Sequence, residues 1–214
     1  MSEFRRRLMK QKAGGYELVD HILTNGLAYI DTGYFVNPNT EVEISCRMEM
    51  NDHSISLETT TGNMFFVGEE TYVYTMNHGG GAAAESFVKA FYYWPHLKYG
   101  QGGVIKEINS AFSWGEDYTF GFRYIDDVYY GFTGRKQIAV SPPAITFSSP
   151  LIFLISREGF PYCRTDMYIY SFKISERGTI VKHFLPAKQG NIYGMAEIIE
   201  GKFYASPNGE SFDY

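Results

Sequence analysis

Two glutamates on one predicted strand, Glu41 and Glu43, come nearest to the spacing that acid–base chemistry needs. Glycoside hydrolysis uses a pair of carboxylates, about 5.5 Å apart when the anomeric configuration is retained. Side chains two positions apart on a strand share a face, but these two alternate with Val42 and Ile44 and therefore point to solvent. The sequence also lacks a Gly-x-Ser-x-Gly motif, a P-loop and a Gly-x-Gly-x-x-Gly motif. We interpret the glutamates as structural and expect no catalytic residues.

Metal ligands are the next chemistry to test, and the five histidines share no ligand spacing. Asp31, Asp126 and Asp127 are oxygen donors near predicted turns, so calcium held by loops is one alternative. Adjacent aspartates such as Asp126 and Asp127 are also typical of turns, because their side chains bond to their own backbone. The sequence predicts no metal and no cofactor, with calcium as that alternative.

Aromatic and polar side chains gather between positions 77 and 99 and form the candidate carbohydrate-binding set. The set comprises Asn77, His78, Tyr92, Trp94, His96 and Tyr99. Flat rings stack on the apolar faces of pyranoses, while amide and imidazole groups hydrogen-bond to hydroxyls. In a chain that is 17% aromatic, such a run also fits a core with its rim, or a protein–protein patch.

The elements that must position these groups are short strands. Residues 41–50 alternate strictly, with Val42, Ile44 and Cys46 on one face, which predicts a half-buried strand. Further strands are expected at 16–22, 28–31, 64–68, 71–76, 86–93, 104–108, 117–124, 128–132, 136–140, 151–156, 166–174 and 179–184. Residues 166–174 depart from strict alternation, which indicates either burial on both faces or a β-bulge.

Many short strands, 22 glycines and no long stretch of helical periodicity favour an all-β fold of two antiparallel sheets. With 214 residues we expect one domain at 16–214, preceded by an arm at 1–15. The longest apolar run, residues 151–155, is too short for a membrane helix, and no signal peptide is recognisable. We therefore expect synthesis in the cytoplasm and no membrane partner.

The arm is basic and contains Phe4, Arg5, Arg6, Arg7 and Leu8. Phe4 and Leu8 would share a face of a short helix, although an extended arm is equally compatible with the sequence. The first 12 residues carry +4, so the remainder carries −9, because the whole chain carries −5. An acidic body does not suit nucleic acid, so the arm is either a solvated tail or an assembly arm that reaches another subunit.

The two cysteines, Cys46 and Cys163, do not make a disulfide framework in a chain of this length. Two interpretations remain at this point. They are two free buried thiols, or they pair across the two sheets.

Two stretches resemble a group of phage and prophage structural proteins of gut bacteria. The first runs from Tyr16 to Gly33, contains Tyr29-Ile30-Asp31-Thr32-Gly33 and continues into residues 39–44. The second comprises residues 167–174, 181–187, Gly194-Met195 and 201–204. The opening residues 4–9 are also similar to some Bacteroidales members. The family has Tyr-Asp after Gly-Met where this chain has Ala196-Glu197, so a role for that pair does not transfer.

The resemblance implies a concanavalin A-like (laminin G-like) jelly-roll sandwich, a fold shared by lectins and glucanases. Hydrolases of this fold carry Glu-x-Asp-x-x-Glu, and no Glu-x-Asp occurs here. The main prediction is therefore a non-catalytic structural or binding module, tail-associated in a phage or prophage particle. The alternatives are a carbohydrate-binding module for surface glycans and, third, a glycoside hydrolase. The expected partners are a glycan, other particle subunits, or a second copy held by the arm.

Overall fold

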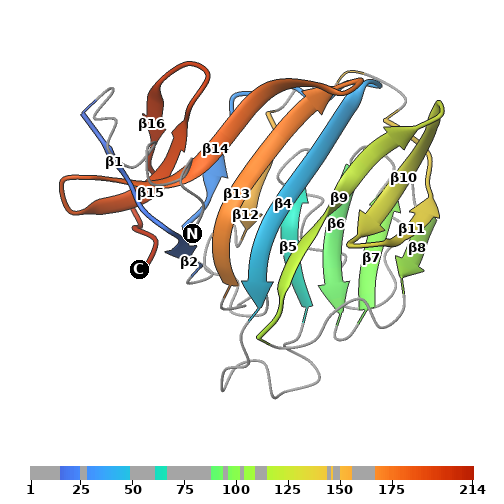
Figure 1. Ribbon diagram of the computed structural model, residues 1–214, viewed down its shortest axis with the longest axis horizontal. Helices are drawn as coiled ribbons and strands as arrows, with labels where there is room; N and C mark the ends of the chain where they lie inside the picture. Colours follow the sequence, from blue (N-terminus) through green and yellow to red (C-terminus); the bar gives the residue numbers. More distant parts are fainter. Residues whose placement is uncertain are drawn as a thin grey trace.

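Two antiparallel β-sheets lie face to face in a computed structural model of the chain (Figure 1). The structure describes residues 15–24, 28–48, 61–66, 88–93, 96–101, 104–108, 115–143, 146, 150–155 and 167–214. For residues 48, 61–66, 88–93, 96–101, 104, 105, 107 and 152–155 it describes the backbone alone. Within these ranges every regular element is a strand, as the sequence predicted.

The larger sheet has ten strands, in the order β11-β10-β9-β4-β13-β14-β15-β16 with β1 and β2 beside β14 and β13. Its strands are β1 (Glu17–Leu18), β2 (Ile22–Leu23), β4 (Thr40–Met48), β9 (Asp117–Ile125), β10 (Val128–Thr133), β11 (Lys136–Ala139), β13 (Met167–Glu176), β14 (Thr179–Gln189), β15 (Ile192–Glu197) and β16 (Lys202–Tyr204).

The smaller sheet has six strands, in the order β3-β12-β5-β6-β7-β8. They are β3 (Ile30–Asp31), β12 (Ile152–Ile155), β5 (Thr61–Phe66), β6 (Val88–Tyr93), β7 (His96–Gln101) and β8 (Val104–Ile108). The chain passes from one sheet to the other between β2 and β3, β3 and β4, β4 and β5, β8 and β9, β11 and β12, and β12 and β13. Such exchange between two antiparallel sheets is the arrangement of a jelly-roll sandwich, which confirms the predicted fold class.

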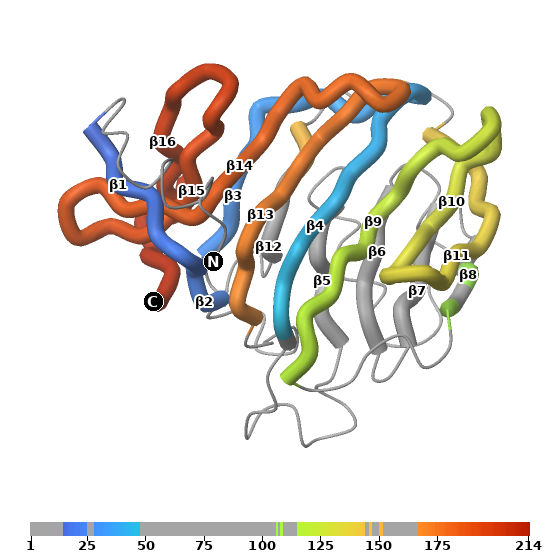
Figure 2. Tube along the Cα trace, viewed as in Figure 1, coloured from blue at the N-terminus to red at the C-terminus, as the bar shows by residue number. Residues whose placement is uncertain are grey.

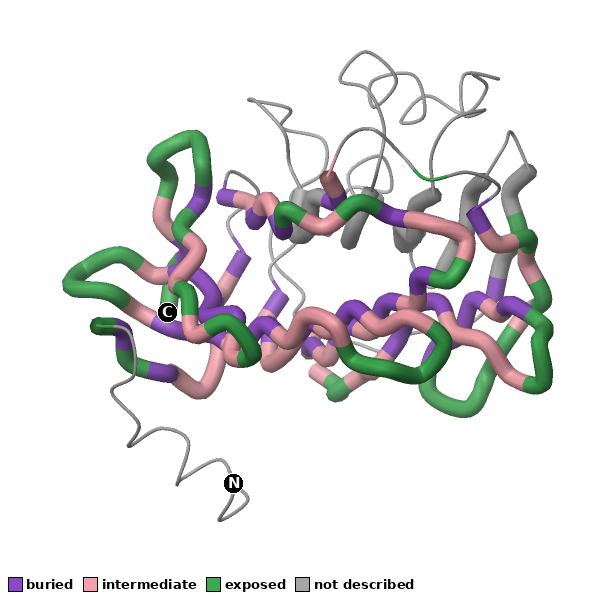
Figure 3. The backbone as a smooth tube through the Cα atoms, turned by 90° about the horizontal axis from the view of Figure 1, so that it is seen from above, coloured by how far each residue is buried: buried purple, intermediate pink, exposed green. Residues whose placement is uncertain are grey.

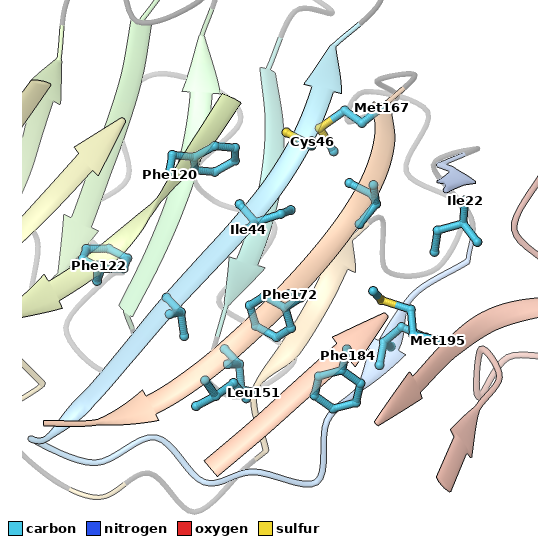
Figure 4. Packing of buried hydrophobic residues seen from close by; sticks show 14 of the residues in the cluster. Ile22, Ile44, Cys46, Phe120, Phe122, Leu151, Met167, Phe172, Phe184 and Met195 are labelled. Carbon is cyan, nitrogen blue, oxygen red and sulfur yellow. The ribbon is translucent and has the colours of Figure 1, made fainter. Parts of the chain in front are cut away.

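The core lies between the two sheets, and buried positions alternate with half-buried ones along strands of the larger sheet (Figure 3). Alternation along β4 puts Val42, Ile44 and Cys46 on this face, as the sequence predicted. Phe120, Phe122 and Phe172 meet them from the neighbouring strands (Figure 4). Cys46 is a free thiol, in line with the first of the two interpretations, and burial raises its pKa. Cys163 lies outside the described residues.

The irregular strand β13 contains a bulge. Its pairing with β4 shifts register between Ile169 and Ser171, and its pairing with β14 shifts between Ile174 and Ser175. The extra residue lets Ile169 and Phe172 both point into the core although they are three positions apart. Of the two sequence interpretations of residues 166–174, the bulge is therefore confirmed.

Strands β13 and β14 separate after the pair formed by Phe172 and Phe184, and the N-terminal segment 17–24 fills the gap between them (Figure 2). On the same edge of β13 that pairs with β14, Ile169 pairs with Ile22 of β2. On the edge of β14 that pairs with β13, Ala187 pairs with Leu18 of β1. The N-terminal segment is thus a wedge that belongs to both strands, which we call the N-terminal wedge.

Hydrogen bonds extend the wedge beyond its two short strands. The amide of Val19 donates to the carbonyl of Pro186 at 2.9 Å, and the amide of Thr24 donates to the carbonyl of Met167 at 3.0 Å. Leu23 and Asp213 exchange two backbone bonds of 2.8 and 3.0 Å, so the C-terminal tail covers the wedge. Buried backbone groups need partners, and these bonds supply them where β13 and β14 have parted.

The C-terminal part of the larger sheet is longer than the sequence predicted. Strand β14 continues through Pro186 to Gln189, and β15 and β16 were not expected. Proline has no amide hydrogen to donate, but its carbonyl still accepts the bond from Val19. A second, smaller core covers this part of the sheet and comprises Tyr16, Leu18, Ala187 and Ala196.

Glu197, which stands where the resembling family has aspartate, is a fully buried carboxylate. It accepts the backbone amides of His183 at 2.7 Å, Ile199 at 3.1 Å and Glu200 at 2.6 Å. A buried carboxylate is tolerated when such donors satisfy it. Its function in this chain is to hold the turn between β15 and β16 against β14.

A polar network closes one end of the sandwich around Tyr34. The Tyr34 hydroxyl donates to Glu176 Oε1 at 2.7 Å, and Asn37 Nδ2 donates to the same oxygen at 2.9 Å. These two hydrogen bonds, Tyr34 first, lower the pKa of Glu176, while burial raises the pKa of Tyr34 to about 12. The network ties the loop before β4 to the end of β13.

Replacement of Ile22 by alanine tests the N-terminal wedge. Ile22 is fully buried among the core residues, so Ile22→Ala should lower the free energy of unfolding by about 2–5 kcal/mol. Urea unfolding of the purified protein measures the change. Ile192→Ala is the matched control, because Ile192 is 49% exposed and its loss should cost at most about 0.5 kcal/mol. Equal effects of the two substitutions would contradict the role of the wedge.

The Tyr34 network should make the free energy of unfolding depend on pH in the acidic range. The folded pKa of Glu176 lies below its ordinary value of 4.5, so near this pH the folded state binds fewer protons than the unfolded state. The stabilisation that the ionised Glu176 contributes is therefore lost as pH falls through the folded pKa. Tyr34→Phe should cost about 1 kcal/mol at neutral pH. The stability difference between the original protein and Glu176→Gln should shrink below pH 4.5, as followed by urea unfolding at several pH values. A difference that stays constant with pH would show that the ionised carboxylate contributes nothing.

Candidate functional site

The predicted carbohydrate-binding set falls mostly where the structure gives no side chains. Asn77, His78 and Trp94 lie outside the described residues. Tyr92 lies on β6, and His96 and Tyr99 lie on the neighbouring β7, each described by its backbone alone. The assembly arm, with Phe4, Arg5, Arg6, Arg7 and Leu8, also lies outside the described residues. Both sets stay predictions.

The loop aspartates do not gather into a cation site. Asp31 Oδ1 accepts the amide of Gly33 at 2.9 Å, and Asp127 Oδ1 pairs with Arg177 at 3.1 Å. Asp126 and Asp127 have φ of 48° and 62° in the turn between β9 and β10, so the turn interpretation is confirmed. Across the described ranges, no group of three or more His, Cys, Asp or Glu side chains could hold a metal ion. The same ranges contain no helix long and apolar enough to cross a membrane.

The outer face of the larger sheet carries a groove of about 220 Å³, which we call the outer-face groove. Its polar and aromatic lining residues are Glu41, Glu43, Arg123, Phe132, Lys173 and Ser175. Gly178 and Ile180 border it at the turn between β13 and β14. Val42 and Phe122 also line it, and because their side chains belong to the core, they offer mainly backbone to the groove.

A glycine in the middle of the sheet, which has no side chain, leaves space for this groove. In the strand register Gly121 of β9 lies between Glu43 of β4 and Phe132 of β10. Its φ is 155°, and a Cβ atom there would overlap the carbonyl oxygen of Val42. Glycine is therefore required, and the row of outward side chains is interrupted at this point.

Glu43 and Lys173 form the groove's ion pair, with Lys173 Nζ 2.7 Å from Glu43 Oε1. The two side chains are 37% and 32% exposed, so the pair itself adds roughly 0.5 kcal/mol to stability. Its larger effect is on geometry, because the ammonium fixes one carboxylate oxygen. The second oxygen of Glu43 has no hydrogen bond to the residues that the structure describes.

Glu41 is held differently, by backbone donors. Its Oε1 accepts the amide of Tyr124 at 2.7 Å and its Oε2 accepts the amide of Gly178 at 2.5 Å. The carboxylate thereby fastens β9 to the turn after β13. With both oxygens engaged, it is poorly suited to proton transfer or nucleophilic attack.

Arg123 leans away from these carboxylates. Its guanidinium carbon lies 4.2 Å from the centroid of the Phe132 ring, and its Nη2 donates to Gln137 of β11 at 3.3 Å. The ring is almost fully buried beneath it, with 3% exposure. A cation over an aromatic face is stabilised by the ring quadrupole, so Arg123 is committed to this wall of the groove.

His183 of β14 extends the row beyond Lys173, its partner in the register. Burial first, and then the charge of Lys173, lower the pKa of His183. The imidazole is therefore neutral at pH 7, and the row does not gain a further cation there.

Comparison with known proteins does not assign this chain to a family. No protein-family model matches, and no curated protein matches. Among solved structures the chain is similar to sheep galectin-11 in complex with glycerol, at 13% identity and a TM-score of 0.36, over 74% of this chain and 99% of that one. It is also similar to the mouse laminin α1 chain, domains LG4-5, at 11% identity and a TM-score of 0.42, over 86% of this chain and 47% of that one. The superpositions are loose, so the fold and the groove rest on this chain's own strand pairings and contacts.

The sequence indicated parts of this groove without assembling it. Glu41 and Glu43 face outward as expected, but Arg123 of β9 and Lys173 and Ser175 of β13 were missed because they come from two other stretches of the chain. One signal was present. An isolated glycine inside an aromatic-rich strand, as at position 121, indicates a close backbone approach.

Substitution of Gly121 tests the need for glycine at this position. Gly121→Ala should lower the free energy of unfolding because the new Cβ overlaps Val42 and the strand must shift. Gly134→Ala is the matched control, since Gly134 also has a positive φ but has open space around it. Gly121→Ala should cost about 1–3 kcal/mol more than the control in thermal or urea unfolding. A smaller cost than that of Gly134→Ala would show that the sheet tolerates a side chain there.

Proposed function

We propose that this domain is a non-catalytic carbohydrate-binding module and that the outer-face groove holds one sugar ring of its ligand. The observation that carries the proposal is the lining of this groove. Two carboxylates, an ammonium, a guanidinium and a hydroxyl surround it, and the exposed apolar side chain of Ile180 borders it. Sugars combine hydroxyls with apolar ring faces, and sites that bind such ligands combine convergent polar groups with apolar surface.

The size of the groove supports a single ring. Pockets for drug-sized ligands measure roughly 300–1,000 Å³, and the outer-face groove is smaller, at about 220 Å³. A polysaccharide could seat one residue there while its neighbours run along the open sheet surface. Such partial enclosure fits recognition of a chain better than capture of a small metabolite.

The non-catalytic part of the proposal rests on the two glutamates. A retaining glycosidase needs one carboxylate free to attack and one free to deliver a proton. Both oxygens of Glu41 accept backbone amides, and Glu43 is paired with Lys173. Neither arrangement suits the acid–nucleophile division of roles.

A tail-associated role in a phage particle, which the sequence resemblance implied, is compatible with this proposal, because a particle subunit can also bind the surface of its host. That role depends on the arm at residues 1–15, of which nearly all lies outside the described residues. It stays a prediction.

Blocking the groove should abolish binding. On a glycan array, with and without added Ca²⁺, the original protein should bind a subset of glycans. Ser175→Trp should weaken that binding by about tenfold or more, because an indole would occupy the space beside Glu43 and Lys173. Ile192→Trp should leave it unchanged, since it places the same indole at an exposed position on β15.

Three outcomes would contradict the proposal. Absence of binding to any glycan would remove the function itself. Loss of binding on Trp94→Ala, with Ser175→Trp unaffected, would move the site to the set between residues 77 and 99. Hydrolysis of a bound glycan that Glu43→Gln abolishes would make the protein an enzyme.

A further inference from the structure

We infer that the ligand of the outer-face groove is an uncharged sugar, oriented by hydroxyl groups that donate to Glu43. The inference rests on the proposed function and adds the chemical class of the ligand and the residue that selects it. It depends on which charges of the groove are already matched and which atoms remain open.

The formal charges of the groove cancel, because Glu41 and Glu43 are balanced by Lys173 and Arg123. Lys173 is bound to Glu43 at 2.7 Å. Arg123 lies over Phe132 and donates to Gln137, on the side away from β4. The groove therefore offers no net positive charge to an anionic ligand.

An anionic ligand would instead meet the two carboxylates. Glu41 and Glu43 stand two positions apart on the same face of β4, and the oxygens of Glu41 are held by neutral backbone amides. The body of the protein beyond residue 12 also carries −9. The groove has no net charge that would attract a uronic or sialic acid, and the long-range field of the acidic body opposes such a ligand.

Glu43 is the side chain that can accept hydrogen bonds from the hydroxyl groups of a ligand. One of its oxygens is paired with Lys173, and its side chain is 37% exposed, so the carboxylate is accessible to a ligand in the groove. An ionised carboxylate only accepts hydrogen bonds, and hydroxyl donors suit it. Lys173 acts through Glu43 as a positioning residue.

The test compares matched neutral and acidic oligosaccharides by isothermal titration calorimetry on the full chain. Neutral oligosaccharides should bind, and their uronic-acid counterparts should bind about tenfold more weakly at low ionic strength. The difference in affinity between neutral and acidic oligosaccharides should become smaller at high salt, because exposed charges are screened. Glu43→Gln should weaken neutral binding about tenfold, since an amide oxygen is a weaker acceptor than a carboxylate, and should make the same difference in affinity smaller.

Glu210→Gln is the control, with the same change of charge at an exposed position whose backbone amide donates to Asn208 Oδ1 at 3.1 Å. It should leave both affinities unchanged. Binding of acidic sugars in preference to neutral ones, or neutral binding unaffected by Glu43→Gln, would overturn the inference while leaving a carbohydrate-binding protein. Absence of binding to both series would overturn the proposed function and the inference together.

Discussion

The separation of β13 and β14 after Phe172 and Phe184 is the constraint on which the rest of the larger sheet depends. A gap inside a sheet leaves two rows of backbone groups without partners and opens the core. The N-terminal wedge closes it with pairings to both strands, and its Ile22 belongs to the same core cluster as Met195 (Figure 4). Strand β14 can then leave the sandwich and build the extension with β15 and β16 (Figure 1).

The extension is stabilised by contacts that the sandwich does not provide. Its outer face is covered by Tyr16 and Leu18, which come from the start of the same N-terminal segment. Its inner turn is held by the buried carboxylate of Glu197. One N-terminal segment therefore joins the two parts of the larger sheet, and its Leu23 pairs with Asp213 of the C-terminal tail.

The outer-face groove lies in the other half of this sheet, where β13 and β14 still pair and β4 and β9 run beside them. Its walls come from strands whose opposite faces are packed into the core, so the backbone positions of Glu43, Arg123 and Lys173 are fixed. The turn that borders it is fastened by Glu41. A site built on paired strands is preorganised, and less ordering entropy is lost on binding than with a mobile loop.

Alternation and turn chemistry were enough to predict the all-β class, the inward face of β4 and the turn at Asp126 and Asp127, because each depends on neighbours within a few residues. For β13 they left a bulge as one of two alternatives. The sequence did not predict that β14 passes Pro186, since proline has no amide hydrogen for a neighbouring strand. The strand continues because the Pro186 carbonyl accepts a hydrogen bond from the amide of Val19. It did not bring Glu43, Gly121 and Lys173 together either. Strand pairing joins residues 43, 121 and 173, and their order across the sheet and register were decided by packing of the whole core. The sequence determined which way each side chain faces, and only the tertiary structure decided which side chains face one another.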